Sequence, residues 1–229
     1  SNFISTFKII SLNPYYIISL LFAEGCPFKC TFCCVPILYG KYKKRDLDII
    51  KEEILCLIKR MGGVKEFNIQ DEGFLSDRER VYDFLKFIRQ KKIKNKIPFS
   101  CFGRINFMDE ELMNDLSRHS FKAIYYGIES GSNNVLNKIK KGFTIEQAVK
   151  ILLLSKKYFK KVVASFIFGY PFEEKNDFLN TVMYFKYLES KGIITQFHLL
   201  CPLPDTELCK LYGKNLRFSE KVISDIVPV

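Results

Sequence analysis

The residues best suited to chemistry are cysteines gathered on one short segment. Four of the eight cysteines fall in residues 25–34, which read Gly-Cys-Pro-Phe-Lys-Cys-Thr-Phe-Cys-Cys. Cys26, Cys30 and Cys33 have the spacing Cys-x3-Cys-x2-Cys. Thiolates are the soft ligands that iron–sulfur clusters take. Three thiolates from one loop hold three irons of a four-iron cluster, and the remaining open coordination position marks a site that binds a reactant.

Zinc binding and disulfides are the alternatives for these cysteines. A zinc site needs a fourth ligand, but Cys34 is adjacent to Cys33 and its side chain should diverge, and His119 and His198 have no metal-binding spacing. Disulfides are disfavoured because no secretory signal precedes the motif. The other five cysteines are predicted to be small buried residues: Cys34, Cys56, Cys101, Cys201 and Cys209.

Composition places the chain among globular proteins with a real core. It has 229 residues, of which 48% are hydrophobic and 27% charged. The net charge of +11 permits a nucleic-acid partner, but the lysines are spread along helical stretches such as 150–161, so solvated helix faces are favoured. No apolar run has membrane-spanning length and no signal-peptide layout is present, so we expect a cytoplasmic protein without a membrane partner.

Short apolar runs alternate with amphipathic helical stretches along the chain. Strands are predicted at 17–23, 64–69, 98–102, 121–128, 162–168 and 193–200. Helices are predicted at 46–61, from Ser76 with a Ser76–Glu79 capping box, at 109–116, from Ser132, from Thr144 with a Thr144–Gln147 capping box, and at 176–190. Such repeats predict a parallel sheet covered by helices, either an open doubly wound sheet or a complete or partial barrel. In both architectures the functional residues follow the strands.

The chain is predicted to form one domain. No Pro/Ser-rich linker interrupts residues 1–229. Residues 1–15 form an N-terminal lead-in, and 206–229 are the least regular stretch, predicted to be an irregular tail.

The cysteine loop resembles the signature of the radical S-adenosylmethionine (SAM) superfamily. In that family the three cysteines carry a [4Fe–4S] cluster whose open iron is chelated by SAM. Reductive cleavage of SAM then releases a 5′-deoxyadenosyl radical, which abstracts a hydrogen atom. The resemblance makes Cys26, Cys30 and Cys33 the cluster ligands, and Phe32 matches the aromatic residue that lies by the adenine.

Further motifs extend the resemblance over nearly the whole chain. They are Gln70-Asp71-Glu72-Gly73-Phe74, Phe102-Gly103-Arg104, Gly127-Ile128-Glu129-Ser130-Gly131-Ser132 with Val135-Leu136 and Lys140-Lys141-Gly142, Phe168-Gly169-Tyr170-Pro171-Phe172-Glu173, and Pro202-Leu203-Pro204-Asp205-Thr206. The subgroup most like this chain is the cobalamin-binding-type and methylthiotransferase-like branch. The resemblance implies a partial six-stranded (β/α) barrel, with the cluster loop after the first strand.

Two acidic residues and one arginine are candidates for binding SAM. By resemblance, Asp71 or Glu72 binds the amino group, and Glu72 is favoured; a charge near a helix N-terminus is the alternative. The guanidinium of Arg104 suits the SAM carboxylate, and pairing with Asp71 or Glu129 is the alternative.

Residues after the fourth strand and on the fifth complete the candidate site. Glu129 can accept hydrogen bonds from ribose hydroxyls, or can pair with Arg104 in a turn. Ser165 and Ile167 share one face of their strand; by resemblance they flank the adenine, and as plain sequence they are core residues.

The resemblance predicts a radical SAM enzyme that needs a reductant such as flavodoxin or ferredoxin and acts on an unknown substrate, with methyl transfer weakly favoured. No Asp-x-His-x-x-Gly cobalt-ligating motif is present, so cobalamin would require another domain or a partner. Either the chain is an excerpt of a longer protein or this member works without cobalamin.

Two alternative functions remain open for this chain. One is an RNA-modifying methylthiotransferase. The other is a non-catalytic iron–sulfur protein, which would need a fourth cysteine ligand such as Cys34, Cys101 or Cys201.

Overall fold

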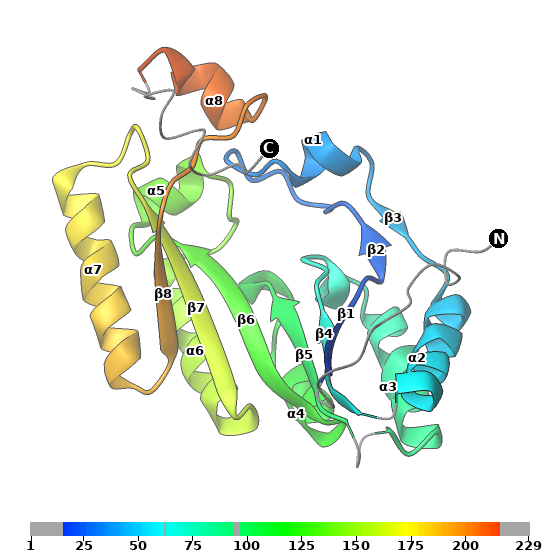
Figure 1. Ribbon diagram of the computed structural model, residues 1–229. Helices are drawn as coiled ribbons and strands as arrows, with labels where there is room; N and C mark the ends of the chain where they lie inside the picture. The colour runs from blue at the N-terminus through cyan, green and yellow to red at the C-terminus, as the bar shows by residue number, and fades with distance from the viewer. Residues whose placement is uncertain (1–15, 62, 94–96, 216–229) are drawn as a thin grey trace.

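A six-stranded parallel sheet forms the centre of the protein (Figure 1). The computed structural model describes residues 16–61, 63–93 and 97–215, so the predicted lead-in lies outside the described residues. The strand order is β1-β4-β5-β6-β7-β8. The strands are β1 (Tyr16–Leu20), β4 (Val64–Ile69), β5 (Phe99–Gly103), β6 (Phe121–Glu129), β7 (Lys161–Phe168) and β8 (Ile194–Leu199).

Helices connect successive strands and cover the outer side of the curved sheet (Figure 1). They are α2 (Leu47–Met61), α3 (Arg78–Gln90), α4 (Glu110–Arg118), α6 (Ile145–Tyr158) and α7 (Lys175–Ser190). Parallel neighbours need such crossovers, because the chain must return to the same end of the sheet. The predicted parallel α/β architecture is confirmed.

Phenylalanines fill the space between the sheet and α3. Phe67 and Phe99 on adjacent strands stack with ring centroids 5.5 Å apart, and Phe84 of α3 packs edge-on against Phe99 at 5.7 Å. All three side chains are fully buried. Alternate residues of the strands therefore face the helices, and the intervening residues face the inner side of the sheet.

The first strand ends earlier than predicted. β1 stops at Leu20, and Ala23–Glu24 form a separate short strand, β2, paired antiparallel with β3 (Lys43–Lys44). The backbone N–H groups of Phe22 and Ala23 donate to the carboxylate of Asp71 at 2.5 and 2.8 Å. These amides thus bind the Asp71 side chain, from the segment after β4, and not a neighbouring strand. The chain therefore leaves the sheet at this point.

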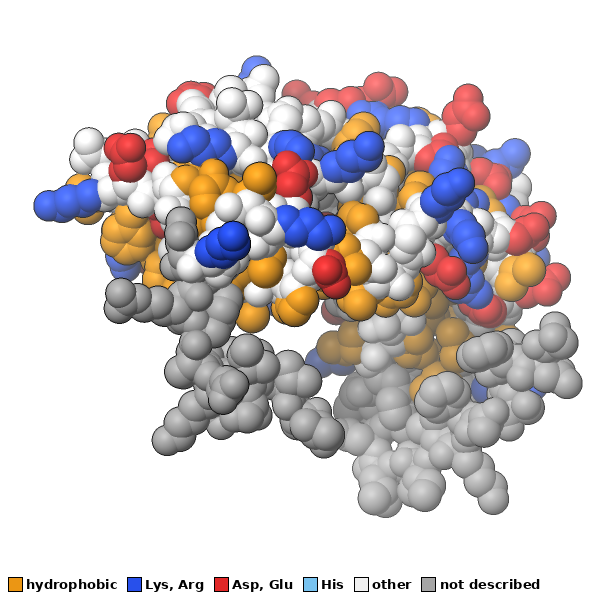
Figure 2. All heavy atoms as spheres, turned by 90° about the horizontal axis from the view of Figure 1, so that it is seen from above, with side chains coloured by type: hydrophobic (Ala, Val, Ile, Leu, Met, Phe, Trp, Pro, Cys, Tyr) orange, Lys and Arg blue, Asp and Glu red, His pale blue; other side chains and the backbone are white. Residues whose placement is uncertain are grey.

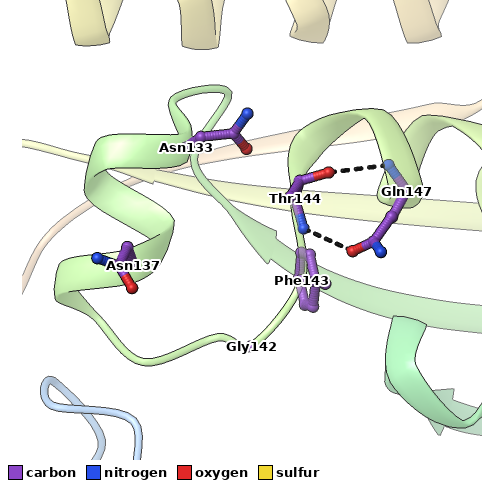
Figure 3. A pocket seen from close by; sticks show the side chains of 6 residues that line it. All are labelled: Asn133, Asn137, Gly142, Phe143, Thr144 and Gln147. Atoms are coloured by element: carbon purple, nitrogen blue, oxygen red, sulfur yellow. Dashed lines mark hydrogen bonds between the residues drawn. The ribbon is translucent and has the colours of Figure 1, made fainter.

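One predicted capping box is confirmed and the other is wrong. Thr144 and Gln147 cap α6 reciprocally (Figure 3). Helix α3 instead begins after Asp77, whose carboxylate accepts from the N–H of Arg80 at 3.2 Å. The Ser76 hydroxyl donates to the carbonyl of Gly73, because Ser76 belongs to a preceding 3₁₀ turn.

The predicted irregular tail begins with a helix. Thr206 caps α8 (Glu207–Tyr212), and residues 216–229 lie outside the described residues. Figure 1 shows α8, α1 (Val35–Tyr39) and α5 (Asn133–Lys138) at the same edge of the sheet as the cysteine loop. No helix in the described part of the chain combines the length and the apolar character needed to cross a membrane.

Candidate functional site

The cysteine loop follows β1 and is held by backbone hydrogen bonds at its middle. The N–H of Thr31 donates to the carbonyl of Ile139 at 3.3 Å, and the carbonyl of Thr31 accepts from the N–H of Leu208 at 2.8 Å. Within the loop, the N–H of Cys33 donates to the carbonyl of Cys30 at 3.1 Å. The loop is therefore fastened to the end of α5 on one side and to α8 on the other.

The three motif cysteines are free thiols, each half-buried. Burial raises the pKa of Cys33 to about 11 and raises the pKa of Cys26 above its usual value. The charges of Cys26 and Cys30 further oppose ionisation of Cys33, so the three sulfurs lie near one another. A bound cation would relieve this cost, because metal ligation favours the thiolate.

This donor set fits an iron–sulfur cluster. Among the described residues, no three His, Cys, Asp or Glu side chains are placed to hold one metal ion. A four-iron cluster presents a separate iron to each thiolate, so its ligands need not converge on one point. Cys26, Cys30 and Cys33 are thus the residues that would hold the cluster.

The prediction that the other five cysteines are buried is confirmed only for Cys101, which lies in the core. Cys201 is exposed, and Cys34, Cys56 and Cys209 are half-buried. Cys34 precedes α1 as its N-cap residue, and its side chain makes no capping hydrogen bond. The general tendency of free cysteines to be buried therefore does not extend to these four residues.

Arg104 follows β5 and reaches back to the cysteine loop. Its Nη1 donates to Cys30 Sγ at 3.6 Å, and its Nη2 donates to the carbonyl of Lys141 at 2.6 Å. Its guanidinium lies 4.0 Å from the ring centroid of Phe28, a residue that stands between the first two motif cysteines in the sequence. Asp71 and Glu129 are the alternative partners predicted for Arg104. They bind other groups instead: Asp71 binds backbone amides, and Glu129 pairs with Lys141.

Asp71 and Glu72 follow β4 and differ in environment. Asp71 is buried, and its carboxylate is used by the two backbone amides that end β1. Burial raises the pKa of Asp71, and those amides oppose the shift. Glu72 is exposed and has no hydrogen-bond partner in the described part of the chain. Desolvation by the surrounding protein raises the pKa of the Glu72 carboxyl; the positive charge of Lys141 opposes this shift and the negative charge of Glu129 adds to it.

Glu129 ends β6 and forms a buried ion pair. Its Oε1 lies 3.2 Å from Nζ of Lys141, and the two side chains are only 10% and 7% exposed. Glu129 has a positive φ of 75°, at an irregularity in the β6–β7 register. A Cβ at Gly127 would come within 2.3 Å of the Glu129 carboxylate, so a larger residue there would displace that carboxylate from its present position. The acid thus points across the inner side of β6.

The Ser-Gly-Ser segment after Glu129 is anchored to α7. The hydroxyl of Ser132 donates to Asp177 at 2.5 Å, and the N–H of Gly131 donates to the hydroxyl of Thr181 at 2.9 Å. A Cβ at Gly131 would meet the backbone of α7 at 2.6 Å. This close packing holds Glu129 at a defined position.

Aromatic rings close one side of the site. Phe32 packs edge-on against Tyr170, with ring centroids 6.1 Å apart. Tyr170 is 3% exposed, and its hydroxyl has no hydrogen-bond partner among the described residues. Burial raises the pKa of Tyr170 well above its usual value, and the charges of Glu129, Glu173 and Cys30 add to the shift. The hydroxyl therefore lies among acidic groups next to the cysteine loop.

Ser165 and Ile167 are half-buried on the inner side of β7. Phe166 between them packs against Phe185 of α7, at 6.0 Å between ring centroids, so its neighbours face the opposite way. Ser165 pairs in register with Gly127 of β6. The shared face predicted for these two residues is observed.

Sequence reasoning missed the role of Lys141. Lys140-Lys141-Gly142 is one of the motifs that carry the resemblance, but no role is predicted for Lys141 from the sequence. The structure places Lys141 beside Glu129, Glu72 and the Arg104 guanidinium. Its side chain is the buried cation at the centre of the site.

Two other surface features lie outside this cluster. A hollow beside α5 and α6 is lined by Asn133, Asn137, Gly142, Phe143, Thr144 and Gln147 (Figure 3). Its Thr144 and Gln147 are engaged in the capping box. On the face in Figure 2, lysines and arginines are interspersed with acidic and apolar side chains, which gives no support there for a nucleic-acid surface.

A family comparison identifies the chain. The model of the radical SAM superfamily matches residues 20–185, and the protein belongs to this superfamily. Radical SAM enzymes use a [4Fe–4S] cluster and SAM, and they need a reductant and a substrate. The family is the one predicted from the cysteine loop.

Similar proteins include one named as a methyltransferase and one named as a tRNA-modifying synthase. An uncharacterized methyltransferase of Pyrococcus horikoshii is 29% identical over 187 residues, covering 81% of this chain and 40% of that protein. A tRNA-2-methylthio-N(6)-dimethylallyladenosine synthase of Buchnera aphidicola is 28% identical, covering 77% and 43%. This chain therefore spans about two fifths of the length of these relatives.

Solved structures establish the fold. The radical SAM methyltransferase TsrM of Kitasatospora setae, with cobalamin and a [4Fe–4S] cluster bound, has a TM-score of 0.76 at 20% sequence identity. The match covers 89% of this chain and 41% of that one. It confirms the predicted partial (β/α) barrel.

Proposed function

We propose that this chain, residues 1–229, is the core domain of a radical SAM transferase. Cys26, Cys30 and Cys33 hold a [4Fe–4S] cluster. When bound, the cluster supplies the electron that cleaves SAM into methionine and a 5′-deoxyadenosyl radical, which abstracts a hydrogen atom from the substrate. The observation that carries the proposal is that Arg104 bridges the cysteine loop and Lys141, the partner of Glu129: it donates to Cys30 Sγ and to the carbonyl of Lys141. The charge of Glu72 also acts on Cys26.

The chain's own residues bind and orient SAM. Glu72 is the acid with a free carboxylate, which suits an ammonium group, whereas Asp71 supports the loop. Glu129, oriented by Lys141, accepts from ribose hydroxyls. Two N–H groups of Arg104 remain for a carboxylate. Phe32 and the inner residues Ser165 and Ile167 flank the adenine.

The transferred group is a methyl or methylthio group. Relatives named as a methyltransferase and as a tRNA-2-methylthio-N(6)-dimethylallyladenosine synthase support this class. An RNA substrate is the second candidate, favoured by the tRNA-modifying relative and by the net charge of +11. Cobalamin would come from another domain or a partner. The electron donor is a flavodoxin or ferredoxin, and the location is cytoplasmic.

Anaerobic reconstitution with iron and sulfide, followed by reduction and addition of SAM, tests the proposal. We expect four irons per chain and 5′-deoxyadenosine detectable by mass spectrometry. Cys30→Ala should lose both, whereas the matched variant Cys56→Ala on α2 should keep both. A stable four-iron cluster in Cys30→Ala would refute the ligand assignment. A wild-type cluster that leaves SAM intact would favour an electron carrier.

A further inference from the structure

Arg104 is held rigidly against the cysteine loop. Three of its N–H groups are engaged: Nη2 with the carbonyl of Lys141 at 2.6 Å, Nε with Oδ1 of Asn106 at 3.3 Å, and Nη1 with Cys30 Sγ at 3.6 Å. The face of Phe28 covers the guanidinium at 4.0 Å. Because its partners come from the 3₁₀ turn after β5, the segment before α6 and the cysteine loop, the side chain has one preferred position.

The contact with Cys30 brings a permanent positive charge and a hydrogen-bond donor to a cluster-binding sulfur. A guanidinium stays protonated across the accessible pH range, so this charge is constant.

We infer that Arg104 is a positioning residue that raises the reduction potential of the cluster held by Cys26, Cys30 and Cys33. This inference rests on the proposed function. Reduction transfers one electron from the flavodoxin or ferredoxin donor to the cluster and exchanges no proton or bond. The cluster gains one negative charge, and a nearby fixed cation stabilises the reduced form more than the oxidised form. Hydrogen bonds to the sulfurs act in the same direction.

The test is a potentiometric titration of the reconstituted holoprotein without SAM. The reduced cluster is quantified by electron paramagnetic resonance at a series of poised potentials. We expect Arg104→Met to lower the ratio of reduced to oxidised cluster at least tenfold at a fixed potential, which corresponds to about 59 mV for a one-electron couple. Arg104→Gln, which keeps N–H donors but no charge, should also lower it.

Arg118→Met is the matched control. Arg118 is exposed at the end of α4, just before β6 begins, so it lies at the opposite end of the sheet from the loop. The variant Arg118→Met changes the net charge by the same amount as Arg104→Met does. The reduction potential of its cluster should equal that of the wild type.

Each remaining result decides against the inference. Equal potentials for both Arg104 variants and the control would overturn it. A shift seen only after SAM is added would assign Arg104 to the ligand instead. Loss of the four-iron cluster in both Arg104 variants, with the control intact, would assign Arg104 to assembly and overturn the tuning role. A wild-type protein that binds no four-iron cluster would refute the proposed function itself, so the two failures are distinguishable.

Discussion

The buried pair between Lys141 and Glu129 should be essential to the stability of the site. Both side chains are at least nine-tenths buried, and the 3.2 Å contact brings their opposite charges together. Lys141→Met removes the cation and leaves the Glu129 carboxylate buried without it. Removing one partner of a buried pair costs about 3–5 kcal/mol. For a chain of this size each kcal/mol lowers the melting temperature by about 2–4 °C, so the expected loss is roughly 6–20 °C.

Anaerobic thermal and urea unfolding of the cluster-free protein would measure this loss. The double variant Lys141→Met/Glu129→Gln should recover most of it, because neither charge is then left alone. A loss below about 1 kcal/mol for Lys141→Met, or a double variant no more stable than additivity predicts, would refute the buried pair.

Three further variants separate ligand contacts from structural ones. Glu72→Gln should weaken SAM binding about tenfold or more, measured by calorimetry on the holoprotein, with little change in stability. Because the pKa of Glu72 is raised, its carboxylate becomes protonated at a higher pH than an ordinary glutamate does, and the affinity of the wild type for SAM should fall from that pH downward. The affinity of Glu72→Gln should not change over the same pH range. The same pH dependence of SAM affinity in both proteins would exclude Glu72. Asp71→Ala should lower the free energy of unfolding by at least about 2 kcal/mol, since two buried amides lose their acceptor, and unchanged urea unfolding would contradict this. The pKa of Asp177 is lowered by hydrogen bonds, the Ser132 hydroxyl first, that outweigh its burial. Its stabilisation is therefore complete above the ordinary aspartate pKa and is lost as pH falls through the lowered value, a dependence that Asp177→Asn should remove from acid-unfolding curves.

Local patterns identified the elements and the cysteine loop. The predicted strands at 64–69, 121–128 and 162–168 agree with β4, β6 and β7 within one residue at each end. This agreement has a physical basis, because buried parallel strands are nearly continuous apolar runs and amphipathic helices repeat every 3.6 residues. Cys-x3-Cys-x2-Cys needs no tertiary information, since all three ligands come from one loop.

Partner choice at the site depended on packing. Asp71 and Glu72 are adjacent acids, and the sequence favours Glu72 for the SAM amino group only by resemblance. Only the fold brings the amides of Phe22 and Ala23 to Asp71. The early end of β1 has the same cause. Neither contact is local, because the partners are 48 and 49 residues apart.

The sequence by itself determined the parallel α/β class, the three cysteines proposed to bind the cluster and the strand ends that carry the acidic residues. Only the tertiary structure decided that Arg104 contacts Cys30 and that Lys141, not Arg104, pairs with Glu129. The reason is that a charged side chain after a strand has several oppositely charged candidates within reach. Burial, glycine-sized gaps such as Gly127 and the curvature of the sheet select among them, and these follow from contacts between distant segments.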